Sequence, residues 1–248
     1  MNRSVLIVLS LALVGCQTSP TPPPTKPVSL SSVFRLAKLE EIDSAIGQAI
    51  AAGKAPGAVV RIESGRAVYQ KTFGDKAAKP ERSPMTADTI FDAASLTKVI
   101  ATAPAIALLI EQGKLGLDDR VEKWIPGFKK NGKGAVTIRH LLTHTSGLRP
   151  GLSPRPEWSG VATAIAKAKA EPLTEQPDTK FIYSDINFIL LGEIVRLVSG
   201  ERLDLFVSKN IFQPLGMNDT GFLPPLAKRS RVAPTEQVGE VILHGEVH

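Results

Sequence analysis

A serine and a lysine stand three residues apart in "ASLTKV", directly before a long apolar run. In a helix, Ser95 and Lys98 would share one face, with Ser95 at the N-terminus, where free N–H groups favour negative charge. A serine that attacks a carbonyl needs a neighbour to accept its proton and a positive field for the oxyanion. Lysine can accept that proton only when its pKa is lowered, and the apolar surroundings of Lys98 are predicted to lower it. The alternative makes Ser95 an N-cap and Lys98 a surface residue, and this segment alone leaves both open.

Two further segments carry side chains that can move protons. Tyr183 precedes the apolar run of "YSDINFILLGEIV", so its phenol can project from a loop. Beside a cationic lysine, a tyrosine can ionise and act as a general base; the alternative is an amphipathic boundary residue. His144 lies in "LLTHTSGL", whose small and polar residues are typical of a turn that ends a helix. We therefore favour a structural role for His144 over a role as a base.

Four motifs occur in a characteristic order: "SLTKV", "LLTHTSGL", "YSDINFILLGEIV" and "IFQPLGMNDTGF". Together they resemble the serine β-lactamase-like family of class C β-lactamases, penicillin-binding D-Ala-D-Ala carboxypeptidases and related esterases. The resemblance begins near Val33 and implies an α/β (α+β) fold, with an antiparallel sheet, flanking helices and an all-helical lobe. It also implies Ser95 as nucleophile, Lys98 as the motif lysine and Tyr183 as base. The expected function is a serine hydrolase that forms an acyl-enzyme on Ser95 from an ester, D-Ala peptide or β-lactam.

Asp185 departs from the family pattern, in which an asparagine at this place orients the substrate amide. A carboxylate cannot donate that hydrogen bond, and Asn187 cannot face the same way along a helix. Asp185 is therefore the candidate substrate-binding residue, and it favours an esterase or carboxypeptidase over an efficient β-lactamase.

A second departure concerns the family's third motif, Lys-x-Gly or His-x-Gly, which would supply an oxyanion-hole N–H. His244-Gly245 lacks the required spacing. We therefore expect a C-terminally truncated member without the later sheet strands and terminal helix, and with little or no hydrolase activity. The alternative function is a catalytically inactive lipoprotein or cell-wall-binding remnant.

The elements that must position these residues follow from apolar spacing and turn residues. The pattern predicts a helix over 33–54, a hairpin over 57–74, and helices over 99–110, 118–125, 136–148, 159–170, 184–200 and 203–214, with N-caps at Asp118 and Thr137. We expect one partial domain over 30–248. It comprises helix plus hairpin (30–90), a mostly helical lobe (91–235) and the start of a return to the sheet (236–248).

The first sixteen residues have the pattern of a lipoprotein signal peptide. A ten-residue apolar run is followed by "LVGC", so Cys16, the only cysteine, would be lipidated. Residues 17–29 form a Pro-rich tether. The prediction is a protein of the bacterial cell envelope, anchored through Cys16 to the outer membrane and facing the periplasm. The alternative is an ordinary signal peptide with an incidental cysteine.

The charge of +6 does not indicate nucleic-acid binding, because the basic clusters at 129–133 and 228–231 have no interleaved aromatic residues. We interpret both clusters as solvated loops. We expect a small-molecule or peptidoglycan-like acyl substrate and no cofactor. A zinc site of His244 and His248 is disfavoured, because the glycine and valine between them are poor helix residues.

Overall fold

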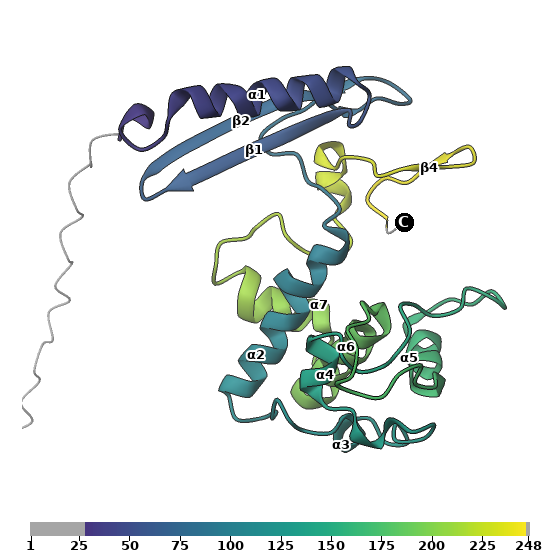
Figure 1. Ribbon diagram of the computed structural model, residues 1–248. Coiled ribbons are helices and arrows are strands. Elements are labelled where there is room, and N and C mark those ends of the chain that lie inside the picture. Colours follow the sequence, from purple (N-terminus) through teal and green to yellow (C-terminus); the bar gives the residue numbers. More distant parts are fainter. Residues whose placement is uncertain (1–27, 247–248) are drawn as a thin grey trace, which may run out of the picture. The chain divides into compact units, whose positions relative to one another are not determined.

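The computed structural model describes residues 28–246, which form two compact units, 28–73 and 74–246. The predicted signal peptide, Cys16, most of the tether and His248 lie outside the described residues. Figure 1 shows a first unit made of a helix and a hairpin, and a second unit dominated by helices.

In the first unit, a helix lies along a hairpin (Figure 1). Its elements are a 3-10 turn (Leu30–Ser32), α1 (Leu36–Ala51), β1 (Gly57–Ser64) and the start of β2 (Ala67–Ala77). The Lys71 Nζ atom lies 2.5 Å from Asp43 Oδ2, and the Tyr69 hydroxyl donates to the same carboxylate. That hydrogen bond raises the pKa of Tyr69 to about 12. The predicted helix and hairpin are therefore both present, and these contacts join them.

Short strands extend this pattern in the second unit. β3 (Ser83–Pro84) pairs antiparallel with the end of β2, which gives the strand order β1-β2-β3. β4 (Gln237–Val238) and β5 (Val241–Ile242) form a separate antiparallel pair. The terminal segment was predicted to begin a return to the hairpin sheet. Within the described residues, its two strands instead pair with each other.

The other helices lie close to their expected positions. They are a 3-10 turn (Ala94–Leu96), a π-helical turn (Lys98–Thr102), α2 (Ala103–Glu111), α3 (Val121–Trp124), a 3-10 turn (Lys133–Ala135), α4 (Ile138–Leu142), α5 (Val161–Ala170), α6 (Asp185–Ser199), α7 (Leu203–Val207), a second π-helical turn (Ser208–Phe212) and a 3-10 helix (Leu226–Arg231). The 3-10 helices at 133–135 and 226–231 were not predicted, because both lie in basic clusters without an apolar period.

One of the two predicted helix caps is confirmed and the other is wrong. At α4, the His140 N–H donates to Thr137 Oγ1, and the Thr137 N–H donates to His140 Nδ1 at 3.2 Å. Asp118 caps nothing, because α3 begins only at Val121. Its carboxylate instead accepts two hydrogen bonds from the Arg139 guanidinium, which lowers the pKa of Asp118.

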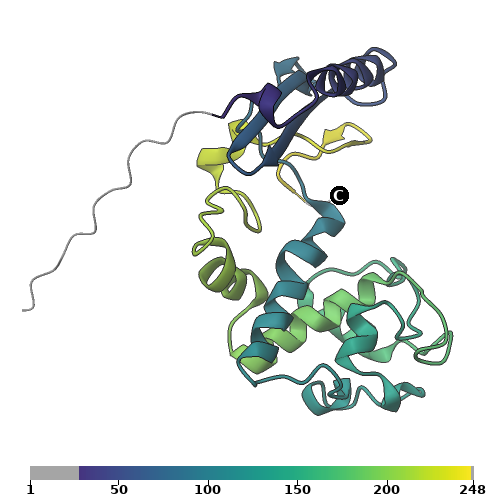
Figure 2. The same cartoon turned by 60° about the vertical axis from the view of Figure 1, so that its left-hand side comes forward.

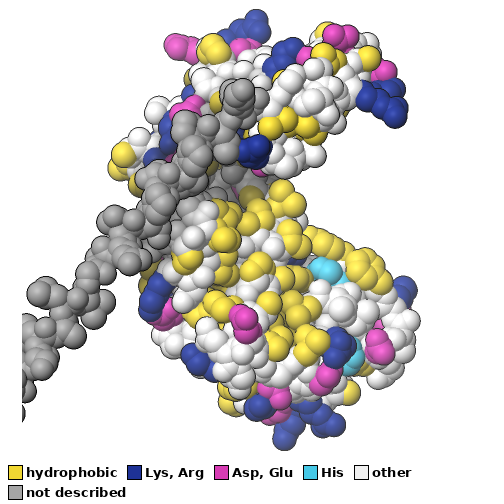
Figure 3. Space-filling view, turned by 90° about the vertical axis from the view of Figure 1, so that its left-hand side faces the viewer, with side chains coloured by type: hydrophobic (Ala, Val, Ile, Leu, Met, Phe, Trp, Pro, Cys, Tyr) yellow, Lys and Arg dark blue, Asp and Glu magenta, His cyan; other side chains and the backbone are white. Residues whose placement is uncertain are grey.

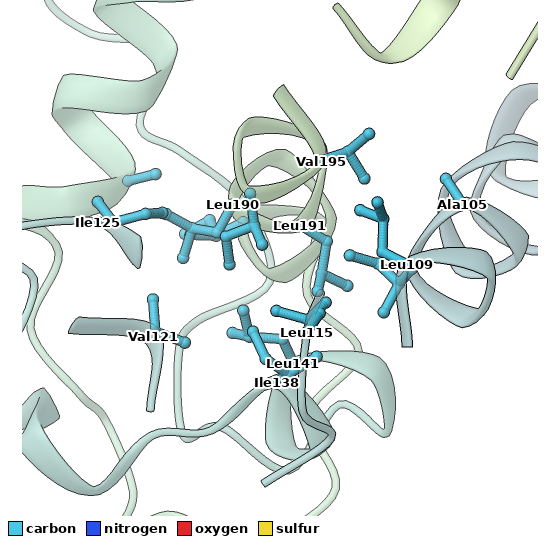
Figure 4. Packing of buried hydrophobic residues seen from close by; sticks show 14 of the residues in the cluster. Ala105, Leu109, Leu115, Val121, Ile125, Ile138, Leu141, Leu190, Leu191 and Val195 are labelled. Atoms are coloured by element: carbon cyan, nitrogen blue, oxygen red, sulfur yellow. The ribbon is translucent and has the colours of Figure 1, made fainter. Parts of the chain in front are cut away.

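The hydrophobic core of the second unit is built around α6. Leu190, Leu191 and Ile194 are fully buried, and Figure 4 shows Leu191 and Val195 facing Leu109 of α2. Figure 2 likewise shows α2 beside α6. By length and composition alone, one described helical stretch (94–111) is apolar enough to cross a membrane. Within this stretch, Ala105, Ile106 and Leu109 are buried in the core of the second unit.

The basic clusters differ from expectation at one residue. Lys133 is fully buried, and its Nζ donates to the carbonyl of Glu171 at 2.5 Å. The prediction of a solvated loop is wrong there, because that carbonyl and the Phe128 ring, 5.1 Å from Nζ, receive the ammonium. In the second cluster, Arg231 forms ion pairs with Asp88 and Asp219.

Candidate active site

Ser95 lies in a tight turn held by a neighbouring carboxylate. Ala94 has a left-handed φ of +43°, which is uncommon for a residue other than glycine. The Ala94 N–H donates to Asp92 Oδ1 at 2.7 Å, and this local hydrogen bond stabilises the turn. Sequence reasoning missed Asp92, although an aspartate two residues before a turn residue is a known turn signal.

The amine of Lys98 lies between the serine and a carboxylate. Its Nζ donates to Ser95 Oγ at 3.2 Å and lies 2.7 Å from Asp185 Oδ1. It also lies 4.9 Å from the centroid of the Tyr183 ring and 5.8 Å from that of Phe188. The structure therefore brings together all four residues that the sequence singled out for chemistry.

The charge state of Lys98 is set by its partners. Burial opposes the ammonium, but hydrogen bonds with Asp185 and Tyr183 outweigh this effect and raise the pKa of Lys98. The prediction that apolar neighbours lower the Lys98 pKa is therefore wrong. The sequence shows the apolar run, but it does not show that Asp185, 87 positions later, supplies a counter-ion.

Tyr183 has the opposite shift. It lies in the loop before α6 with 44% of its surface exposed. Hydrogen bonds with Lys98 and Ser95 lower its pKa. The environment of Tyr183 thus favours loss of the phenol proton.

His144 and Asn187 lie behind the site. The buried His144 accepts a hydrogen bond at Nδ1 from the N–H of Ser184 at 3.0 Å, and its ring centroid lies 4.6 Å from that of Tyr183. Asn187 is fully buried, and its Oδ1 accepts from Ser146 Oγ at 2.7 Å. As expected, Asn187 faces away from Asp185, and His144 has packing and hydrogen-bonding contacts typical of a structural residue.

Exposed apolar side chains lie beside these polar groups. Leu96 and Val99 flank Lys98 in the sequence and Phe181 precedes Tyr183; each is more than half exposed. Figure 3 shows hydrophobic side chains gathered on one face of the second unit.

Of the two residues considered for zinc, only His244 lies within the described residues. Among residues 28–246, no group of three potential metal ligands comes together. His244 Nε2 forms a hydrogen bond of 2.9 Å with the carbonyl of Val232.

The fold is that of serine β-lactamase-like proteins. The beta-lactamase family model matches residues 42–241, and the chain belongs to this family. Over 96% of its length the chain is 34% identical to an Escherichia coli (strain K12) protein named "Putative D-alanyl-D-alanine carboxypeptidase".

Two solved structures show the same likeness. A class C beta-lactamase is 25% identical with a TM-score of 0.73 over 86% of this chain and 59% of that chain. EstCE1, a hydrolase with promiscuous acyltransferase activity, is 28% identical with a TM-score of 0.71, over 83% of this chain and 58% of that one. The chain spans 60% of the length of the Escherichia coli relative.

Proposed function

We propose that this protein is a serine hydrolase that acylates Ser95. The observation that carries the proposal is the position of Lys98 Nζ, 3.2 Å from Ser95 Oγ and 2.7 Å from Asp185 Oδ1. A lysine held as a cation stabilises a phenolate at Tyr183 and leaves that phenolate as the base.

The proposed reaction has two stages. Tyr183 accepts the proton of Ser95 as its Oγ attacks the acyl carbonyl, and the backbone N–H of Ser95 donates to the oxyanion. Collapse of the tetrahedral intermediate transfers the proton from Tyr183 to the leaving group and gives the acyl-enzyme. Water then attacks the ester carbon, and its proton is taken by Tyr183 and returned to Ser95.

Asp185 and the apolar residues near Ser95 support a choice among substrates. A carboxylate already paired with Lys98 accepts hydrogen bonds and cannot donate to a β-lactam amide. Leu96, Val99 and Phe181 offer exposed apolar surface to an acyl group. We therefore propose an ester or a D-Ala-terminated peptide of the cell wall as substrate, in preference to a β-lactam. The names of the carboxypeptidase and hydrolase relatives are consistent with this choice.

Covalent labelling tests the nucleophile. Labelling by a fluorophosphonate needs one attack by Ser95 and no turnover, so it tests the nucleophile even where the hydrolase activity of the 248-residue chain is low. The chain is treated with a fluorescent fluorophosphonate, and labelling is measured by gel fluorescence and by mass spectrometry of the Ser95 peptide. We expect Ser95→Ala to abolish labelling, while Ser230→Ala, at an exposed serine outside the site, leaves the rate unchanged. Labelling that persists in Ser95→Ala would identify a different nucleophile.

We also propose that the protein is anchored to the outer membrane through Cys16 and faces the periplasm. The support is the sequence pattern alone, because Cys16 lies outside the described residues. Cys16→Ala should move the protein out of the membrane fraction or leave its precursor unprocessed. Unchanged fractionation, together with a mature N-terminus that carries no acyl mass, would contradict the anchor.

A further inference from the structure

His144 holds the segment that carries Tyr183 at several points. Its Nδ1 accepts from the Ser184 N–H at 3.0 Å, and its backbone carbonyl accepts from the Ile182 N–H at 2.8 Å. Its ring packs against Tyr183 with centroids 4.6 Å apart and an interplanar angle of 33°. His144 thus binds the residues on both sides of Tyr183 and contacts its ring.

These contacts require one protonation state of the imidazole. Nδ1 accepts from a backbone amide, so the neutral ring must carry its hydrogen on Nε2. A proton on Nδ1 would place two N–H donors face to face at 3.0 Å. The charged and titratable groups that face the ring are Lys98, Asp185 and Tyr183. The amide of Asn187 lies 3.5 Å from Nδ1, and the ring of Phe188 packs nearby.

We propose that His144 is a positioning residue for Tyr183, which keeps the phenol near Ser95 and Lys98 only while the imidazole is neutral. This inference rests on the proposed function of Tyr183 as base. Protonation of His144 breaks the bond to the Ser184 N–H and shifts the backbone beside Tyr183, although the Ile182 N–H and the Ser184 hydroxyl, which donates to the Arg149 carbonyl at 2.6 Å, keep their partners. The phenol then leaves its hydrogen bonds with Ser95 and Lys98, and acylation stops.

The electrostatics favour the neutral ring. Burial and the nearby charge of Lys98 lower the pKa of His144 below its ordinary value of 6.5. The switch therefore acts only on the acidic side of neutrality, and the site is intact at pH 7.

Asn is the informative replacement, because it tolerates the left-handed φ of +58° at position 144 and its Oδ1 can replace Nδ1 as acceptor.

The rate of fluorophosphonate labelling is measured as a function of pH. In the wild type, the logarithm of the rate should fall with slope one as Tyr183 protonates and with slope two once His144 also protonates. His144→Asn should keep slope one throughout, with a rate at pH 7 within about threefold of the wild type. His144→Phe, which has no acceptor, should be at least about tenfold slower than the wild type at pH 7, because a lost buried partner weakens positioning.

His140 provides a matched control, because its Nδ1 also accepts a backbone N–H, that of Thr137 at 3.2 Å, but within a helix cap. His140→Asn should keep the steep acidic limb of the wild type. Identical limbs in the wild type and His144→Asn, or an unimpaired His144→Phe, would overturn the proposal.

A second readout does not need activity. NMR titration of the 248-residue chain should show the Nε2–H tautomer of His144, and the Ser184 amide and Tyr183 ring signals should shift at the His144 midpoint. If no wild-type labelling occurs at any pH, the proposed function fails, and this titration still decides the role of His144. Ser184 and Tyr183 signals that do not move with His144 would refute the inference.

Discussion

Two lysines of the second unit, one partly buried and one fully buried, differ in their electrostatic partners. Lys98, at the candidate active site, and Lys133, in the 3-10 turn before α4, both place Nζ about 5 Å from an aromatic ring. Lys133 is fully buried and 13% of the Lys98 side chain is exposed. Lys98 Nζ forms an ion pair with Asp185 Oδ1 at 2.7 Å. Lys133 Nζ instead donates to the backbone carbonyl of Glu171, and the Glu171 carboxylate acts on it only through its nearby charge.

The difference shows that a counter-ion can reverse the pKa shift that burial causes in a lysine. Burial lowers the pKa of Lys133, and the charge of Glu171 opposes this only in part. The same burial acts on Lys98, but Asp185 and Tyr183 reverse its effect. Lys98 therefore holds its proton more tightly than Lys133 does, and Tyr183 is left as the group that can accept the proton of Ser95.

Matched substitution of the two lysines should give the largest contrast. Lys98→Met keeps most of the side-chain volume but removes the cation that stabilises the Tyr183 phenolate. We expect fluorophosphonate labelling of Ser95 to slow by about 10²–10⁴-fold, the usual contribution of positioned proton transfer. Lys133→Met should label within about twofold of the wild type. Equal losses in both variants would show that the effect on Ser95 is a general loss of folding.

A smaller effect is expected when Asp185 is neutralised, which makes the surroundings of Lys98 resemble those of Lys133. Asp185→Asn removes the counter-ion and adds an amide donor. One hydrogen bond contributes about 0.5–1.5 kcal/mol, so acylation by a fluorescent penicillin should rise roughly two- to tenfold relative to fluorophosphonate labelling. Asp204→Asn, which removes a carboxylate paired with Arg202 instead, should leave the ratio unchanged. A wild type that already prefers the penicillin strongly would contradict the proposed role of Asp185.

Local sequence patterns predicted most of the helices and the hairpin because their causes are local. Thr137 caps α4 as its type and position indicate, and Gly200 ends α6 with a φ of +78°. Asp118 shows where local reasoning fails. An aspartate before a helix is typical of a cap, but Arg139, 21 residues later, takes its carboxylate and the cap hydrogen bond is not made.

The same limit applies to the candidate site. The types and spacing of Ser95 and Lys98, and the tyrosine before a helix, were sufficient to select the residues that the structure brings together. The direction of the Lys98 pKa was not predictable, since it depends on a pairing between residues 98 and 185. The left-handed turn at Ala94 was missed for a different reason, because alanine gives no sign of a positive φ.

The smallest predicted effect tests the Lys133 side of the comparison. The Lys133 pKa lies below its ordinary value of 10.5, so between these two values the unfolded chain binds more protons and stability rises with pH. Glu171→Gln removes the charge that limits this depression, and it should lower the free energy of unfolding at pH 7 by about 0.5–1 kcal/mol. Because the Lys133–Glu171 attraction exists only while Lys133 is charged, the loss should shrink as pH rises through the folded pKa.

Glu171 also pairs with Arg149 at 2.7 Å, so the substitution is repeated in an Arg149→Met background to isolate the lysine contribution. Urea unfolding between pH 7 and pH 11 measures the difference, and a loss in that background that does not vary with pH would show that Glu171 does not act through the charge of Lys133.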